Sequence, residues 1–463
     1  RISHIHNRQP LIINESYINE LLENAKVASK EEVLDIIKKA KDCFGLTFEE
    51  AALLLQVEDE ELLAQMFEAA TYIKEKIYGN RIVVFAPLYT SNECTNNCLY
   101  CGFRAENKEL HRRTLRVKEV VDEAKVIEDQ GHKRILLVCG EDERKTDVDH
   151  IVDSVKAIYD KTDIRRINVN AAPMKVEDFK KLKNIGIGTY QIFQETYHRE
   201  TYKIMHPSGS KSNYDWRLTA LDRAFEAGID DLGIGVLLGL YDYKFDVLAT
   251  LVHSDYLDNK YNVGPHTISI PRLRPAHNSG LKEVPCPVSD EDLRKIVAVY
   301  RLAVPYTGII LSTRESAKLR DELLELGVSQ ISAGSKTNPG GYEEDDNEAT
   351  QFETSDERSV DEMLQVVTKQ GHLPSFCTAC YRAKRTGEAF MELAKDAHIH
   401  EFCHPNAILT FKEYLLDYAS EETKKDGEAL LERELNKVVD KKIKEETIKR
   451  LERIEKGERD LYF

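Results

Sequence analysis

The sequence has no apolar run long enough to cross a membrane, and its first residues lack the apolar core of a signal peptide. It also has no excess of positive charge, since the net charge is −16 at pH 7 over 463 residues. An acidic chain repels phosphate backbones, which argues against general nucleic-acid binding. We therefore expect a cytoplasmic protein with neither a membrane nor a nucleic acid as its partner.

Cysteine is sparse, and its count is odd: nine in 463 residues. Secreted disulfide scaffolds are short and dense in cysteine, so this composition argues against a disulfide framework. Six of the cysteines fall into two tight clusters, and clustered thiols in a reducing compartment usually mark a metal site. The other three, Cys43, Cys139 and Cys286, are isolated, and we interpret them as small buried apolar residues.

Short apolar runs alternate with amphipathic helical stretches from residue 81 onward. The runs are 81–89, 134–141, 166–173, 188–196, 232–241, 267–275, 308–313 and 329–335. Alternation of this kind implies parallel crossovers, and eight units over about 255 residues suit an α/β fold, a TIM-type (βα)8 barrel. We expect three domains: a helical extension at residues 1–80 with a cap at Ser29, the barrel at 81–365, and a mainly helical, cluster-binding domain at 366–463.

The segment ECTNNCLYCGF, residues 93–103, places Cys94, Cys98 and Cys101 directly after the first expected strand. A structural zinc site needs four ligands, and no fourth cysteine lies nearby. Three thiolates in one loop suit an iron–sulfur cube whose fourth iron stays open to another ligand. In a (βα)8 barrel this loop lies at the C-terminal face, where the chemistry of that fold takes place.

This Cys-x3-Cys-x2-Cys spacing resembles the cluster loop of the radical S-adenosylmethionine (SAM) enzymes. The resemblance implies a 4Fe–4S cluster on the three cysteines, which binds SAM and cleaves it reductively to methionine and a 5′-deoxyadenosyl radical. It also implies that Tyr100 and Phe103 contact SAM, with Phe103 beside the adenine.

Two further segments resemble the SAM-binding parts of the same family. VCGED matches the family's Gly-Gly-Glu at the end of the second strand, so Gly140 and Glu141 are expected to receive the SAM amino group, with Cys139 in place of the first glycine. QETYHRETYKIMHPSGSKSNYDWR resembles a segment of the biotin-synthase-like branch. By position, Glu195 is expected to contact SAM and Arg217 to pair with its carboxylate, which a guanidinium can bind in a bidentate manner.

A second triad, Cys377, Cys380 and Cys403, lies at the start of the expected C-terminal domain, after the barrel. Four histidines lie near it in the sequence: His372, His398, His400 and His404. From spacing alone, a structural zinc site and an iron–sulfur cluster fit this triad equally well.

The barrel as a whole resembles the aromatic amino acid lyases among the radical SAM enzymes. A Cys-x2-Cys-x22-Cys triad after the barrel marks the branch that matures the iron-only (FeFe) hydrogenase, and the second triad has this spacing. The resemblance covers essentially the whole chain. It implies that the Cα–Cβ bond of L-tyrosine is cleaved to p-cresol and dehydroglycine near the SAM cluster. It further implies that dehydroglycine becomes carbon monoxide and cyanide at an auxiliary 4Fe–4S cluster on the second triad.

An additional iron at the auxiliary cluster is implied by the same resemblance. It would be attached through an amino acid such as free cysteine, with His266 in GPHTISIPRLRP as its protein ligand. From the residues alone, a lone histidine beside a strand is more often a satisfied core residue. A reductant such as ferredoxin or flavodoxin and the other hydrogenase maturases are the implied partners.

The carboxylate of tyrosine needs a cation at the mouth of the barrel. Arg314 in LSTRE, with Ser312 beside it, follows the seventh expected strand and is our first choice. Arg272 and Arg274 are its rivals, although each of the three arginines also fits a structural ion pair. Two alternative functions stay open: a tyrosine lyase without diatomic products, whose second triad is structural, and a non-catalytic iron–sulfur scaffold.

Overall fold

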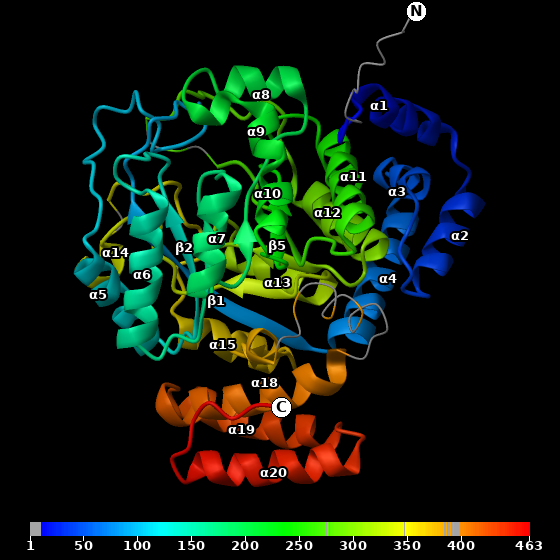
Figure 1. Ribbon diagram of the computed structural model, residues 1–463. Helices are drawn as coiled ribbons and strands as arrows, with labels where there is room; N and C mark the ends of the chain where they lie inside the picture. The colour runs from blue at the N-terminus through cyan, green and yellow to red at the C-terminus, as the bar shows by residue number, and fades with distance from the viewer. Residues whose placement is uncertain are drawn as a thin grey trace, which may run out of the picture.

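A computed structural model describes residues 11–463, apart from 275, 277, 347, 384–385, 387–388, 390–391 and 393–398. Figure 1 shows a central body of strands and helices, with the N-terminal helices along one flank and a layer of C-terminal helices beneath it. Among the described residues, no helix is both long and apolar enough to cross a bilayer.

Eight parallel strands form a barrel in sequence order, and β1 closes it by pairing with both β8 and β2. The strands are β1 (Arg81–Ser91), β2 (Arg134–Cys139), β3 (Arg166–Asn170), β4 (Tyr190–Gln191), β5 (Leu232–Gly235), β6 (Thr267–Ser269), β7 (Gly308–Leu311) and β8 (Gln330–Ser332). Each strand coincides with one of the eight expected runs. The predicted (βα)8 barrel is therefore confirmed.

Helices cover the outside of the barrel and extend from both of its ends. The N-terminal helices are α1 (Glu15–Asn24), the 3-10 turn η1 (Ala25–Val27), α2 (Lys30–Ala40), α3 (Phe48–Leu55) and α4 (Glu60–Tyr78). Around the barrel lie α5 (Val117–Asp129), α6 (Val148–Lys161), α7 (Val176–Ile185), α8 (Arg199–Met205), η2 (Ser210–Ser212), α9 (Tyr214–Leu218), α10 (Ala220–Glu226), α11 (Tyr243–Tyr261), α12 (Asp290–Ala303), α13 (Ala317–Leu326), α14 (Gly341–Glu344) and α15 (Val360–Lys369). The expected cap at Ser29 is present as a capping box with Glu32, and α4 packs against α12 and α13.

Strand β1 has one face toward the apolar core between strands and helices and the other face toward the cavities inside the barrel. The even-numbered residues from Ile82 to Leu88 are fully buried in the apolar cluster shared with the helices. The odd-numbered residues from Arg81 to Tyr89 line two cavities: the first two belong to a lower cavity and the last three to an upper one. Because side chains alternate along a strand, one strand contributes to both cavities while sealing the core behind them.

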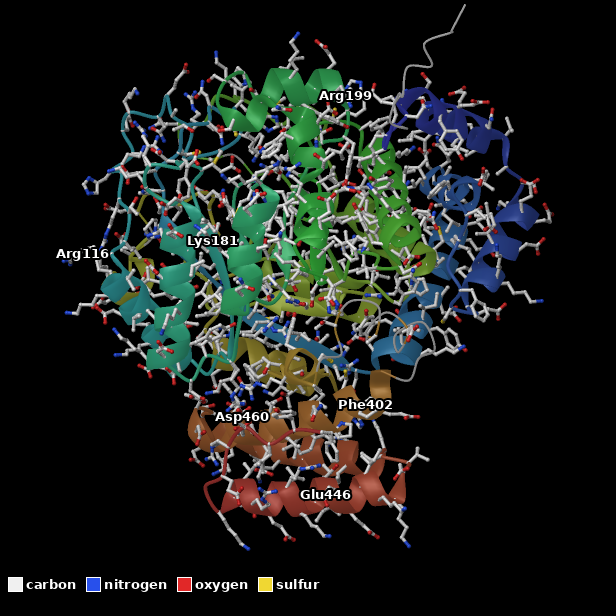
Figure 2. All side chains as sticks on the ribbon, viewed as in Figure 1. Arg116, Lys181, Arg199, Phe402, Glu446 and Asp460 are labelled. Atoms are coloured by element: carbon white, nitrogen blue, oxygen red, sulfur yellow. The ribbon has the colours of Figure 1, made fainter. Side chains whose placement is uncertain are left out.

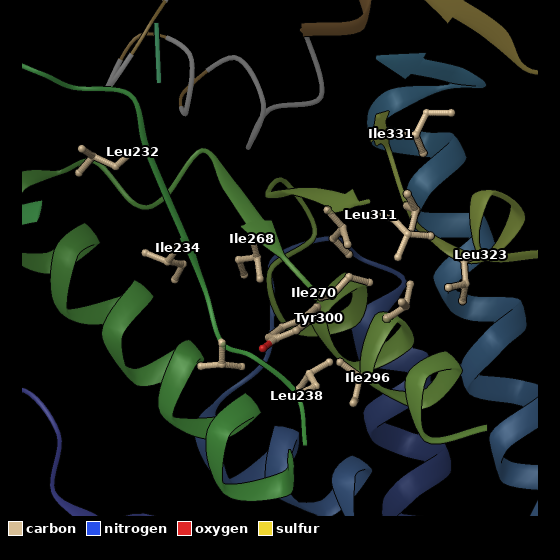
Figure 3. Packing of buried hydrophobic residues seen from close by; sticks show 14 of the residues in the cluster. Leu232, Ile234, Leu238, Ile268, Ile270, Ile296, Tyr300, Leu311, Leu323 and Ile331 are labelled. Carbon is tan, nitrogen blue, oxygen red and sulfur yellow. The ribbon is translucent and has the colours of Figure 1, made fainter. Parts of the chain in front are cut away.

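The same alternation holds β5 to β8 against the outer helices. Figure 3 shows Leu232, Ile268 and Ile331 on these strands, together with Ile296 and Tyr300 of α12, and all five belong to the same buried cluster. Fully burying a side chain of this size contributes about 1.5–3 kcal/mol. This packing keeps the strand ends in fixed positions, and the loops that follow them carry the functional residues.

A ninth strand, β9 (Leu373–Ser375), was not expected from the sequence. Val83 pairs with Gln330 of β8 on one side and with Ser375 of β9 on the other, so β9 lies on the same side of β1 as β2. It pairs with residues 81–83 of β1, before the first residue that pairs with β2, Ala86. Because β9 is parallel to β1 and pairs with its N-terminal end, it brings the following residues to the lower mouth of the barrel. The remaining elements are α16 (Ala379–Arg382), α18 (Ile399–Asp417), α19 (Glu421–Asn436) and α20 (Lys441–Glu455).

A buried ion pair connects the barrel to the C-terminal layer. Arg165, just before β3, donates to both carboxylate oxygens of Glu413 on α18, at 3.1 and 3.0 Å, and each side chain is only 4% exposed. The backbone N–H of Asp460 donates to the same carboxylate at 2.9 Å. Figure 2 labels Asp460 on the tail that runs back along α18. Carboxylate, guanidinium and tail thus form one buried contact between the two parts.

Replacing Glu413 with Gln is expected to lower the free energy of unfolding by about 3 kcal/mol, because the buried Arg165 charge loses its main partner. Urea unfolding of the metal-free chain measures this loss. Glu446→Gln is the matched control. The Glu446 side chain is 42% exposed and lies 3.7 Å from Arg450, and an exposed ion pair of this kind contributes about 0.5 kcal/mol. Equal losses in the two variants would show that the buried pair does not hold the C-terminal layer.

Candidate active sites at the two ends of the barrel

The loop after β1 brings the first triad to the upper end of the barrel. Cys98 is buried, Cys94 and Cys101 are half-buried, and all three line the upper cavity. Backbone hydrogen bonds anchor the loop, from Thr95 N–H to the carbonyl of Glu141 at 3.1 Å and from Leu99 N–H to that of Met205 at 3.0 Å. The three thiols are therefore held at the C-terminal ends of the strands, as expected.

Arg112 and Gly140 shape this loop. Arg112 donates to the carbonyls of Asn92 and Phe103 at 2.7 and 2.6 Å, which folds the loop back on itself. A Cβ on Gly140 would overlap the carbonyl oxygen of Glu93, so only glycine permits this close approach of the end of β2 to the loop. Gly140 was expected from the sequence, whereas Arg112 was not, because its hydrogen bonds go to backbone carbonyls, which leave no pattern in the side chains of the loop.

The donor set of the upper cavity fits an iron–sulfur cluster. Burial raises the pKa of Cys94 to about 11 and that of Cys98 to about 12, so these thiols ionise only when a bound metal compensates the charge. Across the described ranges, no three His, Cys, Asp or Glu side chains converge on a point that could hold a single metal ion. A cluster spreads its thiolates over separate irons, whereas zinc draws them to one centre.

The upper cavity brings together nearly all of the expected SAM and substrate residues. Its lining includes Tyr100, Phe103, Gly140, Glu141, Glu195, Arg217, Ser312 and Arg314. A second hollow beside it shares Gly140, Glu141, Lys211 and Arg217. Residues that follow β1, β2, β4 and β7, together with one from α9, thus converge on the space above the first triad, although their individual roles stay predictions.

Four charged side chains form a compact network in this cavity. Arg217 lies 3.0 Å from Glu141 and 3.9 Å from Glu195, and Lys211 lies 2.9 Å from Glu195. Burial favours protonation of Glu141, but Arg217 and Lys211 outweigh it and hold its pKa below the usual range. The network contains two acids and two bases, so it can bind a zwitterion by exchanging partners. Lys211 was missed because a lysine in a polar loop reads as solvent-exposed.

Glu195 has a left-handed backbone, with φ of 70°, which is uncommon for a residue with a side chain. The two residues that follow are fixed by Asp246 of α11, which accepts hydrogen bonds from the Thr196 hydroxyl at 3.0 Å and from Tyr197 N–H at 2.8 Å. Asp246 is 2% exposed. It therefore supports the strained turn that points Glu195 into the cavity.

Asp246 is expected to make stability depend on pH, because burial raises its pKa to about 7. A raised pKa in the folded state stabilises the fold fully below the unfolded value, near 4, and this contribution is lost as the pH rises to about 7. Asp246→Asn keeps the acceptor oxygen and removes the titration. Melting temperature measured from pH 5 to pH 8 should fall more for the natural chain than for the variant, and parallel curves would contradict this.

The two expected tyrosine-binding arginines differ in their surroundings. Arg314 lines the upper cavity, stacks on Phe352 at 3.7 Å and makes no ion pair with the acidic residues that the structure describes. Arg272 is not part of the described lining. It donates to Glu315 at 3.0 Å and to the Val288 carbonyl at 3.0 Å, and it lies 2.8 Å from Asp290. Its guanidinium is thus fully engaged in a structural ion pair.

The second triad lies at the opposite end of the barrel. Cys377 follows β9, Cys380 lies on α16 and Cys403 on α18, and all three line the lower cavity. Arg134 donates to the Cys377 carbonyl at 2.8 Å. Burial raises the pKa of Cys377 to about 11, so this thiol also needs a metal in order to ionise. Two buried arginines, Arg134 and Arg81, line the same cavity and offset thiolate charge.

The histidines near the second triad do not share one position. His266 lines the lower cavity with the three cysteines, although it is distant from them in the sequence. His372 lies 3.1 Å from Glu325 and His404 lies 2.8 Å from Glu434, so both approach carboxylates. His398 and the side chain of His400 fall outside the described residues. His266 is therefore the histidine that the described structure brings to this triad.

The two cavities are stacked inside one barrel. Adjacent interior positions belong to the lower and the upper cavity in turn: Thr267 and Ser269 on β6, Gly308 and Ile310 on β7, and Gln330 and Ser332 on β8. Two of the isolated cysteines differ from the small buried apolar residues that we expected. Cys139 is buried in the core but also lines the upper cavity, and Cys286 is only half-buried.

Comparisons with known proteins agree with this geometry. Residues 88–252 match the model of the Radical SAM superfamily, and residues 269–373 match the Biotin and Thiamin Synthesis associated domain. The chain is 33% identical over 340 residues to 2-iminoacetate synthase of Escherichia coli strain K12, covering 73% of this chain and 89% of that protein.

Two solved structures are similar over nearly the whole chain. "HydG: A maturase of the [FeFe]-hydrogenase" is 56% identical with a TM-score of 0.95, covering 98% of this chain and 100% of that one. "FeFe-hydrogenase maturase HydG from Carboxydothermus hydrogenoformans" is 45% identical with a TM-score of 0.84, covering 94% and 97%.

The fold, the first triad and the superfamily match define a radical SAM lyase, with SAM and a 4Fe–4S cluster as its cofactors. The similarity to the first of the two solved structures covers 98% of the chain and is therefore not limited to the barrel. The chain belongs to the HydG family of these enzymes.

Proposed function

We propose that the chain is a two-site tyrosine lyase that acts in hydrogenase maturation. The upper site cleaves the Cα–Cβ bond of L-tyrosine to p-cresol and dehydroglycine. The lower site converts dehydroglycine to carbon monoxide and cyanide, which are delivered to iron as a precursor of the FeFe-hydrogenase active site. The observation that carries the proposal is the position of the two cysteine triads at opposite ends of one barrel interior.

Cys94, Cys98 and Cys101 hold the upper cluster in this proposal. With SAM, that cluster supplies a 5′-deoxyadenosyl radical on one-electron reduction. The chain's own contribution is to place SAM above the triad. Glu141 and Glu195 accept from the SAM amino group, and Arg217 pairs with the SAM carboxylate in exchange for its present contact with Glu141 at 3.0 Å.

The aromatic and small residues complete the SAM site. Phe103 is 2% exposed and packs edge-on against Tyr89 at 5.9 Å between ring centres, which gives the adenine a rigid apolar wall. The hydroxyl of Tyr100 forms a hydrogen bond with His206 at 2.8 Å and fixes the segment between Cys98 and Cys101. Gly140 lets the end of β2 approach the cluster loop, because a Cβ there would overlap the Glu93 carbonyl oxygen.

Arg314 and Ser312 bind the tyrosine carboxylate. Arg314 enters the cavity and pairs with no described carboxylate, whereas Arg272 is held by Glu315, so we assign the substrate carboxylate to Arg314 and no longer to Arg272. The half-buried guanidinium is stacked on Phe352 and therefore needs little reordering to form a bidentate pair.

Replacing Arg314 with Ala is expected to raise the KM for tyrosine at least about tenfold, because a hydrogen-bonded charge pair is worth about 1.5–3 kcal/mol. SAM cleavage measured without tyrosine should stay unchanged, since Arg314 does not hold SAM. Arg274→Ala is the matched control, because Arg274 carries the same charge and pairs with Glu315 at 3.0 Å. An unchanged tyrosine KM in Arg314→Ala would move the substrate carboxylate to another residue.

Cys377, Cys380 and Cys403 hold the auxiliary 4Fe–4S cluster at the lower site. Three thiolates leave one corner of a cube open, which is what attachment of an additional iron through a free amino acid such as cysteine requires. His266, whose ring lines the same cavity, is the protein ligand to that iron. On β6, β7 and β8, neighbouring interior positions line the lower and the upper cavity in turn, so dehydroglycine would pass down the barrel interior from one site to the other.

The proposal also includes the setting of the reaction. A reductant such as ferredoxin or flavodoxin supplies electrons, other hydrogenase maturases receive the product, and the compartment is a reducing cytoplasm. The domain limits at residues 80 and 365 belong to the same proposal. A lyase that stops at dehydroglycine is the alternative, supported by the likeness to a 2-iminoacetate synthase.

The upper-site reaction is tested directly. Protein reconstituted anaerobically with iron and sulfide, then reduced, should form p-cresol and 5′-deoxyadenosine in step from tyrosine and SAM. Formation of 5′-deoxyadenosine with no p-cresol would contradict a tyrosine lyase.

A further inference from the structure

A chain of polar side chains runs around the lower cavity and ends at His266. It consists of Asp231, just before β5, Thr189, just before β4, and Tyr381 on α16, the residue after Cys380. Asp231, His266 and Tyr381 all line the cavity that holds the second triad. This row of polar side chains therefore connects the barrel wall to the segment that carries Cys380.

The donor and the acceptor of each hydrogen bond in this row of side chains can be assigned. The Thr189 hydroxyl donates to Asp231 Oδ1 at 2.7 Å, and its oxygen lies 3.2 Å from the Tyr381 hydroxyl, which is then the donor. The other carboxylate oxygen, Oδ2, lies 3.9 Å from His266 Nδ1. Asp231 is only 3% exposed, and Oδ2 is buried with no hydrogen-bond partner among the described residues.

An unpaired carboxylate oxygen at this depth is costly, so a donor is expected to approach it. His266 Nδ1, at 3.9 Å, is in ion-pair range of this oxygen. A metal-binding imidazole is neutral and has one N–H and one lone pair. An N–H on Nδ1 facing Asp231 leaves the lone pair on Nε2, the ring atom that can reach into the cavity.

We propose that Asp231, fixed by Thr189, is a positioning residue that holds His266 in the Nδ1–H tautomer and aims Nε2 at the metal beside the second triad. The assignment rests on the proposed function, in which His266 binds the additional iron. Tyr381 extends the network to α16, so the orientation of the histidine and the position of Cys380 depend on each other. Carboxylate support of this kind changes metal affinity about 10–100-fold.

The test is an Fe²⁺ titration of the full chain whose two clusters have been reconstituted and whose additional iron has been removed. Asp231→Asn places an amide N–H₂ toward Nδ1 and favours the opposite tautomer, so the Kd for Fe²⁺ should rise about 10–100-fold. Thr189→Val removes only the hydrogen bond to the Asp231 carboxylate and should raise the Kd for Fe²⁺ by a smaller factor. p-Cresol formation should stay within about twofold in both variants, which reports that the fold and upper site are intact.

Asp230→Asn is the matched control, because it removes the same charge one residue away. Asp230 is in contact with Thr386 at 3.4 Å, and its carboxylate influences His266 only through space. An unchanged Kd in Asp230→Asn together with the rise in Asp231→Asn supports positioning. An unchanged Kd in Asp231→Asn, or an equal rise in both variants, would overturn it.

His266→Ala separates this proposal from the function on which it rests. A rise in the Fe²⁺ Kd for His266→Ala with none for Asp231→Asn refutes the role of Asp231 alone. A chain that binds Fe²⁺ equally well without His266 refutes the ligand assignment, and with it the positioning role.

Discussion

Replacing Cys94 with Ala is expected to abolish SAM cleavage and every product that follows from it. The thiol is one of the three that the loop after β1 supplies, and the other cysteine of this cavity, Cys139, belongs to β2 and not to that loop. Mutation of a residue that only supports a metal ligand typically lowers metal affinity or activity about 10–100-fold. Loss of a direct ligand should therefore lower SAM cleavage at least about a hundredfold. 5′-Deoxyadenosine formation, measured anaerobically with excess reductant, reports the loss.

Cys286→Ala is the control for this prediction. Cys286 is half-buried and free, and it does not line either cavity in the described structure. Iron content should fall by roughly one cluster in Cys94→Ala and stay unchanged in Cys286→Ala. Retention of SAM cleavage in Cys94→Ala would show that the first triad does not hold the reactive cluster.

Replacing Cys377 with Ala is expected to separate the two reactions. The lower cavity loses a cluster ligand, so carbon monoxide should fall at least about a hundredfold and cyanide should fall with it. p-Cresol should stay within about twofold, because Cys377 lies at the opposite mouth of the barrel from Cys94 and the two cavities have no described lining residue in common. Dehydroglycine, detected as its hydrolysis product, should accumulate in place of the diatomics.

The outcome for Cys377→Ala distinguishes the two remaining functions. Unchanged carbon monoxide with normal p-cresol would return the second triad to a structural role. Loss of p-cresol along with carbon monoxide, in a chain that still unfolds like the natural one, would mean that the sites are not independent.

The barrel was predictable because each of its strands is buried on both faces and reads as a short apolar run. β9 was not predictable for the opposite reason: it has three residues, one of them Pro374, and β1 is its one neighbouring strand in the part of the chain that the structure describes. Proline is tolerated at such an edge position because no second neighbour needs its missing N–H. Yet this strand is what sets Cys377 at the lower mouth.

The two triads were visible because short spacings group their thiols, whereas the SAM residues were predicted only from a resemblance to a known family. Lys211, Asp246 and Asp231 were not, because each acts through a partner that is distant in the sequence. Asp246 supports Glu195 from 51 residues away along the chain, and nothing near it in the sequence distinguishes it from a solvated helix residue. Arg272 shows the converse: its position in the sequence fitted the substrate, but Glu315 had already engaged it.

The most direct test of a two-site enzyme is to measure all three products in one reaction. Reduced, fully reconstituted protein is given SAM and tyrosine without oxygen, and p-cresol, cyanide and carbon monoxide are measured from the same sample. The two-site account predicts all three, with the diatomics following p-cresol. p-Cresol without carbon monoxide and cyanide would contradict it and leave a tyrosine lyase with a structural second triad.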